Sequence, residues 1–250
     1  MENKKGSGVF LGIVSIATLI VAIIGATFAY FSASTESNEG AIGLQAYEYK
    51  LSLSVSPVYP EGASALIPLN PTTVIENAPE PNNTNLLYAI NVANKRCIDD
   101  SGMQVCALYE VLIQNDATNE VVMTGQLETT SNIASTKPGR TPFANLTYQE
   151  ITGEKDKFTL VGSPVTLSAT IGESVPIGDV RVSGGYTDPE TEEFVPGTGR
   201  AYILVYLNDN GNQTGEMGAS FAGKLKYSSK DGAGTTLTGT FKVSAPDPQA

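Results

Sequence analysis

The segment AYILVYL at residues 201–207 consists entirely of apolar and aromatic residues and is the most apolar run in the C-terminal four-fifths of the chain. A short apolar run rich in aromatic and β-branched residues, bounded by Gly199 and by Asn208-Asp209, is typical of a buried β-strand. We therefore expect residues 201–207 to lie at the centre of the fold.

On both sides of this run the sequence shows strand patterns separated by turn residues. In residues 47–56, Tyr49, Leu51, Leu53 and Val55 recur at every second position, as in a half-buried strand. Further strands are predicted at residues 86–93, 105–114, 120–127, 143–151, 157–161, 165–171, 221–228 and 235–243. No helical period persists over three turns after Phe31, so an antiparallel β-sandwich or jelly-roll domain is expected over residues 46–244.

The segments between these strands are predicted to be loops. Six prolines fall within residues 57–81, which excludes a helix there and favours a long surface connection. Residues 184–199 form an acidic loop, and the Pro-containing tail at residues 245–250 is expected to be disordered.

The chain has two cysteines, Cys97 and Cys106, separated by a turn sequence centred on Asp100-Ser101-Gly102. Folding about that turn places the two cysteines opposite each other on adjacent strands. In an exported chain such a pair indicates a disulfide. The spacing is not C-x-x-C, and two thiolates without histidine make a poor zinc site.

The first 31 residues differ in character from the rest. Lys4 and Lys5 precede residues 9–31, which contain no charged residue and no proline. As a helix this segment would be roughly 34 Å long, enough to cross a bilayer core of about 30 Å. The lysines would keep the N-terminus in the cytoplasm and send the remainder outward. We therefore expect export, followed by a polar neck at residues 32–45.

Two fates of the apolar segment remain open at this stage. Thr27 and Ala29 place small residues at the −3 and −1 positions of a signal-peptidase cleavage before Tyr30. Residues 9–31 are, however, longer than the usual apolar region of a signal peptide, which favours a permanent membrane anchor. The partners expected are the membrane, unless the segment is removed, and a signal peptidase.

Composition excludes several functions. The chain has Lys+Arg 15 against Asp+Glu 26, a net charge of −11, which argues against binding nucleic acid. It contains no histidine, which removes Ser-His-Asp and Cys-His catalysis and the H-E-x-x-H zinc sites. The carboxylate pairs Glu192/Glu193 and Asp99/Asp100 lie in turn-like segments. We predict no enzyme activity, no catalytic residues and no cofactor.

The sequence contains a group of oxygen-bearing side chains that are candidate ligands for calcium. Asp209, Asn210 and Asn212 supply oxygen ligands at short spacing, and Glu216 follows. The order of these residues lacks the D-x-[DN]-x-[DN]-G frame of a calcium loop, and Asn-Gly is itself a preferred turn. These four residues are the calcium candidates of the sequence.

The end of the apolar segment, GATFAYFS at residues 25–32, resembles the "G-a-T-x-A-x-F" signals cut by the SipW-type signal peptidase of Firmicutes. Those signals belong to TasA/camelysin-like surface and biofilm-matrix proteins. The neck with the first strand, and YILVYL at residues 202–207 with SFAG at residues 220–223, are similar to the first and late strands of that family.

The resemblance implies a jelly-roll-like domain at the surface or in the extracellular matrix of a Gram-positive-type bacterium. In such fibres the N-terminal strand of one subunit completes the sheet of the next, and here residues 30–44 would be that strand. The metallopeptidase activity attributed to camelysin relatives does not fit a chain without histidine. The cysteine turn and the proline-rich connection have no counterpart in the family.

Two other functions compete with a matrix or fibre subunit. A pilin-like filament subunit would keep the apolar helix after a cut behind Gly8, although no glutamate follows in residues 9–31. A membrane-anchored module could instead bind a glycan or a surface protein, and Tyr186 and Phe194 in the acidic loop are its candidate contact residues.

Overall fold

The computed structural model describes residues 50–60, 65–69, 86, 89–90, 96–99, 102–154, 157–209, 211, 213–231 and 234–247. The chain divides into two compact units, Met1–Ala46 and Tyr47–Ala250, and every described residue belongs to the second. The predicted apolar helix and the neck, residues 1–45, lie outside the described residues. Among the described residues, no helix has the length and apolar character needed to cross a membrane.

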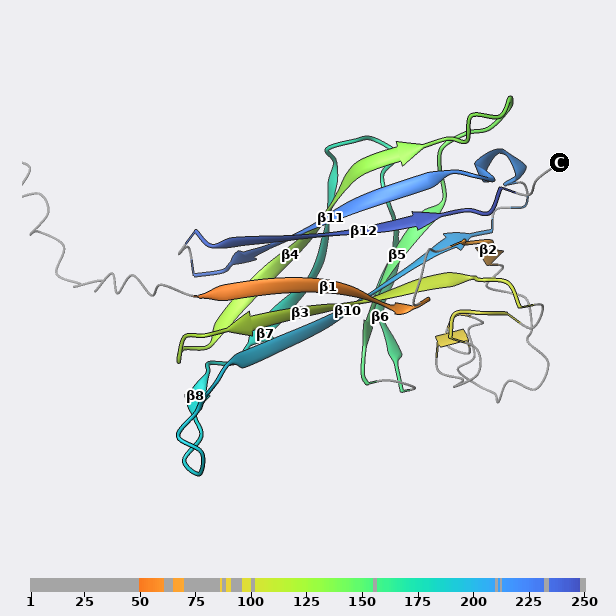
Figure 1. Ribbon diagram of the computed structural model, residues 1–250. Helices are drawn as coiled ribbons and strands as arrows, with labels where there is room; N and C mark the ends of the chain where they lie inside the picture. The colour runs from red at the N-terminus through yellow and green to blue at the C-terminus, as the bar shows by residue number, and fades with distance from the viewer. Residues whose placement is uncertain are drawn as a thin grey trace, which may run out of the picture. The chain divides into compact units, whose positions relative to one another are not determined.

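The second unit is built from β-strands (Figure 1). In chain order they are β1 (Leu51–Tyr59), β2 (Pro68–Leu69), β3 (Cys106–Asn115), β4 (Val121–Ile133), β5 (Leu146–Thr152), β6 (Thr159–Thr166), β7 (Ser174–Val182), β8 (Tyr186–Thr187), β9 (Phe194–Val195), β10 (Gly197–Asn208), β11 (Ser220–Ser229) and β12 (Thr236–Ser244). A short 3₁₀ turn, η1 (Thr214–Glu216), precedes β11.

The strands form two main sheets. The larger has the order β1-β3-β10-β5-β6, all antiparallel, with β2 added in parallel to the end of β10. The smaller has the order β12-β11-β4-β7 and is antiparallel throughout. Strands β8 and β9 form a separate hairpin. The prediction of an all-β, antiparallel fold is confirmed.

The facing sides of the two sheets share one hydrophobic core. Strand β10 lies between β3 and β5 and contributes Ile203, Val205 and Leu207 to this core. The smaller sheet contributes side chains such as Met123 of β4 and Phe221 of β11, both almost fully buried. The expectation that residues 201–207 lie at the centre of the fold is confirmed.

The topology interlocks the two sheets. The consecutive strands β3 and β4 lie in different sheets, and so do β10 and β11. Strand β3 pairs with β10 in the larger sheet, and β4 pairs with β11 in the smaller one. The chain therefore passes from the larger sheet to the smaller one twice, from β3 to β4 and from β10 to β11. The two strands that it leaves are neighbours in the larger sheet, and the two that it enters are neighbours in the smaller sheet.

A second apolar cluster covers part of the outer face of the larger sheet. It combines Leu204 and Tyr206 of β10 with Ile151 of β5 and with Leu86 and Ile90 from the segment before β3. This covering explains why β10 has no alternation of polar and apolar residues: both of its faces are buried.

The structure corrects several predicted segments. Residues 86, 89 and 90 are helical, so the strand predicted at residues 86–93 is wrong. The predicted surface connection at residues 57–81 contains the end of β1, all of β2, and Leu66, which is fully buried. The strands predicted at residues 157–161 and 165–171 are largely one strand, β6, and β7 was not predicted.

The C-terminal segment is also more ordered than predicted, as far as Asp247. The Ala245 N–H donates to the Ala219 carbonyl at 2.9 Å, and the Gly218 N–H donates to the Pro246 carbonyl at 3.0 Å. Asp247 pairs with Lys137 at 2.9 Å, and the hydrogen bond from Lys137 lowers the pKa of this carboxyl. Residues 248–250 lie outside the described residues.

The predicted disulfide is present between Cys97 and Cys106, both fully buried. The turn between them is closed by a bridge between Ile98 and Gln104 and by the Gly102 N–H, which donates to the Asp99 carbonyl at 3.1 Å. The disulfide thus ties the helical segment around Ile90 to the start of β3.

Removing this disulfide should destabilise the domain measurably. For the Cys97→Ala/Cys106→Ala double variant we expect a loss of roughly 2.5–3 kcal/mol in unfolding free energy, because the unfolded chain loses a closed ring. Urea denaturation measures this loss. The control Met103→Ala, in the same turn but exposed, should change the unfolding free energy little. Two reactive thiols in the native protein would contradict the pairing.

Candidate functional site

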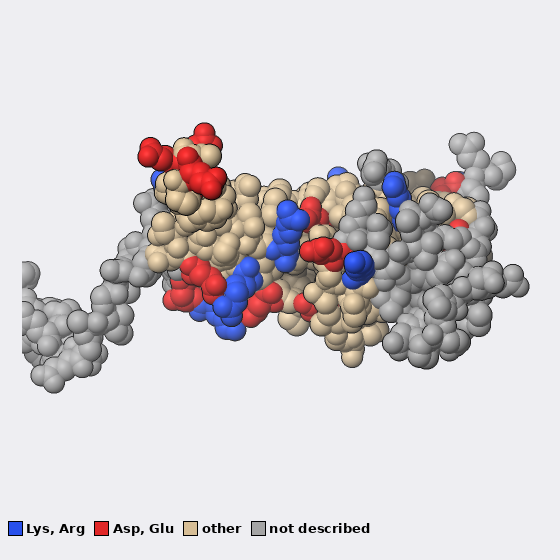
Figure 2. Space-filling model, turned by 90° about the horizontal axis from the view of Figure 1, so that it is seen from below, with Lys and Arg blue, Asp and Glu red and all other residues tan. Residues whose placement is uncertain are grey.

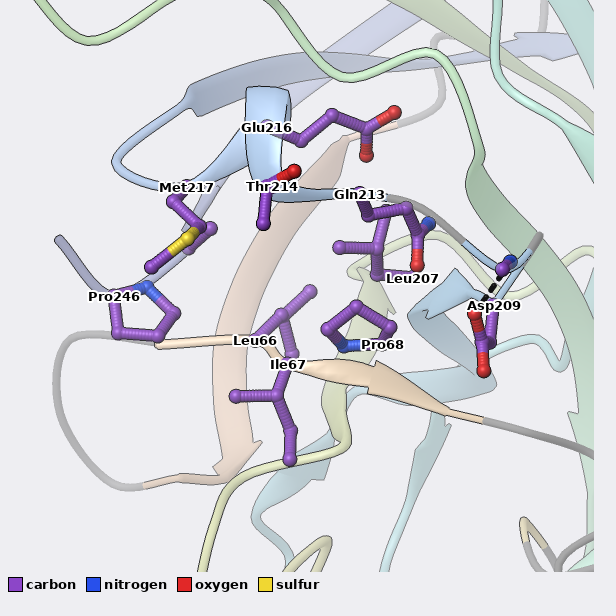
Figure 3. A pocket seen from close by; sticks show the side chains of 12 residues that line it. Leu66, Ile67, Pro68, Leu207, Asp209, Gln213, Thr214, Glu216, Met217 and Pro246 are labelled. Atoms are coloured by element: carbon purple, nitrogen blue, oxygen red, sulfur yellow. Dashed lines mark hydrogen bonds between the residues drawn. The ribbon is translucent and has the colours of Figure 1, made fainter. Parts of the chain in front are cut away.

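A pocket of about 370 Å³ lies at the end of the core where β10 finishes (Figure 3). One wall is the segment with Leu66, Ile67 and Pro68, which pairs through β2 with the end of β10. The other wall is Met217 and the C-terminal segment with Pro246. Leu207 of β10, Asp209, Gly211, Gln213, Thr214, Glu216 and Ala245 complete the described lining.

Main-chain hydrogen bonds from both sheets build the first wall. The Leu66 N–H donates to the Ser244 carbonyl at 2.7 Å, and the Ile67 N–H donates to the Gln104 carbonyl at 2.8 Å. The Asp209 N–H donates to the Leu69 carbonyl at 3.1 Å. The segment therefore spans from the end of β12 to the end of β10 and closes this end of the core.

The η1 turn forms the polar side of the pocket and is held by the loop before β5. The Thr141 N–H donates to the Gly215 carbonyl at 2.7 Å, and Arg140 donates to the Thr214 carbonyl. The Glu216 carboxylate accepts through Oε1 from the Ala144 N–H and from Asn145 Nδ2, both at 3.1 Å. One oxygen of Glu216 thus orders the start of β5.

Two other acceptor atoms in this region have no hydrogen-bond partner. They are Oε2 of Glu216 and Oε1 of Gln213, and both atoms are buried. The side chains belong to residues that are only 5% and 8% exposed. Gln213 donates its Nε2 to the Asn208 carbonyl at 2.6 Å, which fixes the amide with its oxygen free. Buried polar atoms normally form hydrogen bonds, and leaving one unpaired costs free energy. Each of these two oxygens therefore lacks a hydrogen-bond donor.

Two of the four calcium candidates line this pocket, and the other two lie outside the described residues. Asp209 lines the pocket, and its Oδ1 accepts from the Gly211 N–H at 2.8 Å, as in a turn. Glu216 lines the same pocket, whereas Asn210 and Asn212 lie outside the described residues. The described residues contain no group of three or more acidic, cysteine or histidine side chains placed to hold a metal ion.

The predicted acidic loop is a projecting hairpin, β8–β9 (Figure 1). Its tip is closed by the Asp188 and Glu193 main chains, with the Asp188 N–H donating to the Glu193 carbonyl at 2.9 Å. Figure 2 shows acidic side chains gathered at a protruding end of the surface. Tyr186 and Phe194, the predicted contact residues, are 57% and 44% exposed.

A cluster of two buried tyrosines and a half-buried carboxylate lies between β5, β7 and β11. Tyr148, Glu150 and Tyr227 line a cavity of about 150 Å³, and Glu150 lies so close to Gly178 that a Cβ there would overlap its carboxylate. Burial, and to a smaller extent the Glu150 charge, raises the pKa of the Tyr148 and Tyr227 hydroxyls. The described side chains of this cluster pack the space between these strands.

The remaining predicted site residues give no further site. Thr27, Ala29 and Tyr30 of the predicted cleavage signal lie outside the described residues, as does Asp100. Glu192 and Glu193 are exposed at the hairpin tip. Gln213 was not singled out from the sequence, because a glutamine in a polar segment between two strands carries no sign that it will be buried.

Comparisons with known proteins identify no family. No family model matches the chain, and no curated protein matches it. Among solved structures, the chain is similar to one described as "AvmM Catalyzes Macrocyclization in Alchivemycin A Biosynthesis", with 6% identity, 58% of this chain and 82% of that chain covered, and a TM-score of 0.29. A likeness this low supports no argument about fold or function. The resemblance to TasA/camelysin-like proteins therefore stays a prediction.

The tyrosine cluster should make the domain sensitive to alkaline pH. An unfolded tyrosine ionises above about pH 10, whereas Tyr148 and Tyr227 keep their protons in the folded state to higher pH. The unfolding free energy should therefore fall as the pH rises above about 10, by up to about 1.4 kcal/mol per pH unit for each such group.

Urea denaturation between pH 8 and pH 11 measures this slope. Tyr227→Phe should make the slope shallower. In the unaltered protein the Tyr227 hydroxyl ionises in this pH range only when the chain unfolds, and phenylalanine has no hydroxyl to ionise. Tyr186→Phe removes an exposed hydroxyl and serves as the matched control. An equal slope in the two variants would show that Tyr227 does not couple folding to pH.

Proposed function

We propose that this protein is an exported, non-enzymatic structural protein of the cell surface or extracellular matrix. Its domain is a β-sandwich of the jelly-roll class, and it assembles into fibres by β-strand complementation. Residues 30–44, released by cleavage before Tyr30, are the donor strand. The observation that carries this proposal is the outer edge of β12, which neither a proline nor a register shift interrupts.

The four outer strands of the two sheets differ in how they are protected. Strands β1, β6 and β7 each contain a proline, namely Pro57, Pro164 and Pro176. The pairing of each with its neighbour is also interrupted by a register shift. Proline and bulges are the usual means by which sheet edges avoid pairing with another chain.

Strand β12 has neither form of protection. It contains no proline, and it pairs with β11 in one continuous register from Ser244 to Thr236. The carbonyls of Lys242 and Ser244 accept from the Tyr109 hydroxyl and the Leu66 N–H, so these residues face away from β11.

Because alternate residues of a strand point their main-chain groups the same way, Thr238 and Thr240 also face away from β11. The described residues provide no main-chain partner for them. A strand of another subunit could pair with this part of β12. The uninterrupted edge supports β-augmentation as the mode of assembly.

Determining the N-terminus of the protein recovered from cells and medium tests the first step. Intact mass and terminal peptide mapping should show a start at or near Tyr30. A start at Val9 would instead support the pilin-like subunit. An intact Met1 found only in the membrane fraction would support an anchored binding module, in which the exposed Tyr186 and Phe194 would be the contact residues.

Blocking the β12 edge should abolish assembly without unfolding the domain. Thr240→Pro removes one outward-facing N–H and leaves the hydrogen bonds to β11 in place. We expect the released protein carrying this change to stay monomeric, as measured by sedimentation and electron microscopy. Deletion of residues 30–44 should give the same result because the donor is then missing.

Thr240→Val is the matched control, since it keeps the N–H and a β-branched side chain; it should assemble like the unaltered protein. Thermal unfolding of each variant shows whether the domain is still folded. Fibres formed at an undiminished rate by Thr240→Pro, or by the deletion variant, would refute assembly through this edge and this donor.

A further inference from the structure

The pocket at the end of β10 combines apolar walls with two unpaired buried oxygens. From the two unpaired buried oxygens and the apolar walls we propose that it binds an organic ammonium group carried on a short alkyl chain. This inference is independent of the proposed fibre assembly.

The polar part of the pocket calls for a hydrogen-bond donor. Oε2 of Glu216 and Oε1 of Gln213 are acceptors that lack donors, and each belongs to a side chain more than nine-tenths buried. An ammonium group has three N–H donors and no acceptor, so it supplies only the kind of group that these two oxygens lack. A hydrogen bond between charged groups is stronger than one between neutral groups, which favours an amine over an alcohol.

No cation of the described residues already fills this role. Lys137 pairs with Asp247, and Arg140 donates to the Thr214 carbonyl. Glu216 forms no ion pair with any described lysine or arginine. The chain has a net charge of −11, which raises the local concentration of small cations around it.

The apolar part of the pocket suits an alkyl chain rather than a hydrated metal ion. The side chains of Leu66, Ile67, Pro68 and Met217 surround the space beside the polar residues in Figure 3. A calcium ion needs six to eight oxygens. The only other carboxylate in the described lining, that of Asp209, already accepts from the Gly211 N–H. A volume of about 370 Å³ accommodates a small organic ligand.

Calorimetric titration of the full chain in a non-ionic detergent tests this proposal. The probe is n-butylammonium, with 1-butanol as its neutral analogue of similar size. We expect saturable binding of the ammonium and at least tenfold weaker binding of the alcohol. Nα-acetyl-lysine amide carries the same group; tighter binding of this probe than of butylammonium would indicate a lysine side chain of a partner as the source, and weaker binding would indicate a free amine.

The variant Glu216→Gln keeps an acceptor for the Ala144 N–H and replaces the unpaired oxygen by an amide that can donate. It should weaken butylammonium binding at least tenfold, and Gln213→Leu should weaken it as well. Glu193→Gln removes the same charge at the exposed hairpin tip and should leave binding unchanged. Thermal unfolding checks that each variant is folded.

Three results would overturn the proposal. They are equal binding of butylammonium and butanol, undiminished binding of butylammonium by Glu216→Gln, and binding of calcium alone in a manner that depends on Glu216. If Glu216→Gln fails to fold, Gln213→Leu decides the matter, because its side chain does not order the start of β5.

Discussion

The burial of β10 on both faces is the constraint on which the rest of the structure depends. Its odd-numbered side chains, such as Ile203 and Val205, lie in the core between the sheets, and Leu204 and Tyr206 lie in the outer cluster. Two separate layers must therefore cover this strand. The smaller sheet supplies the first, and the segment before β3, tied by the disulfide, supplies part of the second. Pairing with β3 and β5 then satisfies the main chain on both sides.

The sequence predicted the fold class and the centre of the fold because these depend on local pattern. The apolar run at residues 201–207, the alternation in residues 47–56 and the two cysteines each carry their own signal. The errors fall where tertiary contacts decide. The segment at residues 86–90 is a short apolar run, and such a run is compatible with either a strand or a helix. Strand β7 was missed because Pro176, Gly178 and Asp179 interrupt its pattern, and an edge strand tolerates such residues.

The pocket shows a second limit of sequence analysis. Glu216 was named from the sequence as a weak calcium candidate, but its burial depends on the loop before β5 and on the C-terminal segment, which are distant in the chain. The same holds for Leu66, which lies in a proline-rich region and yet joins β12 to the pocket wall. The hairpin with Tyr186 and Phe194 is at the other end of β10, about 35 Å away for a strand of this length. The two surfaces can therefore bind separate partners.

The geometry of β12 also limits how an added strand could be bound. Tyr109 and Leu66 already occupy the outward carbonyls of Lys242 and Ser244, so only Thr236, Thr238 and Thr240 offer free main-chain positions within the strand. A main-chain hydrogen bond contributes about 0.5–1.5 kcal/mol net. A few such bonds do no more than offset the cost of association, which is about 4–15 kcal/mol. A donor strand must therefore also bury apolar side chains, and Ile42 and Leu44 in the neck have the two-residue spacing to place both on one face.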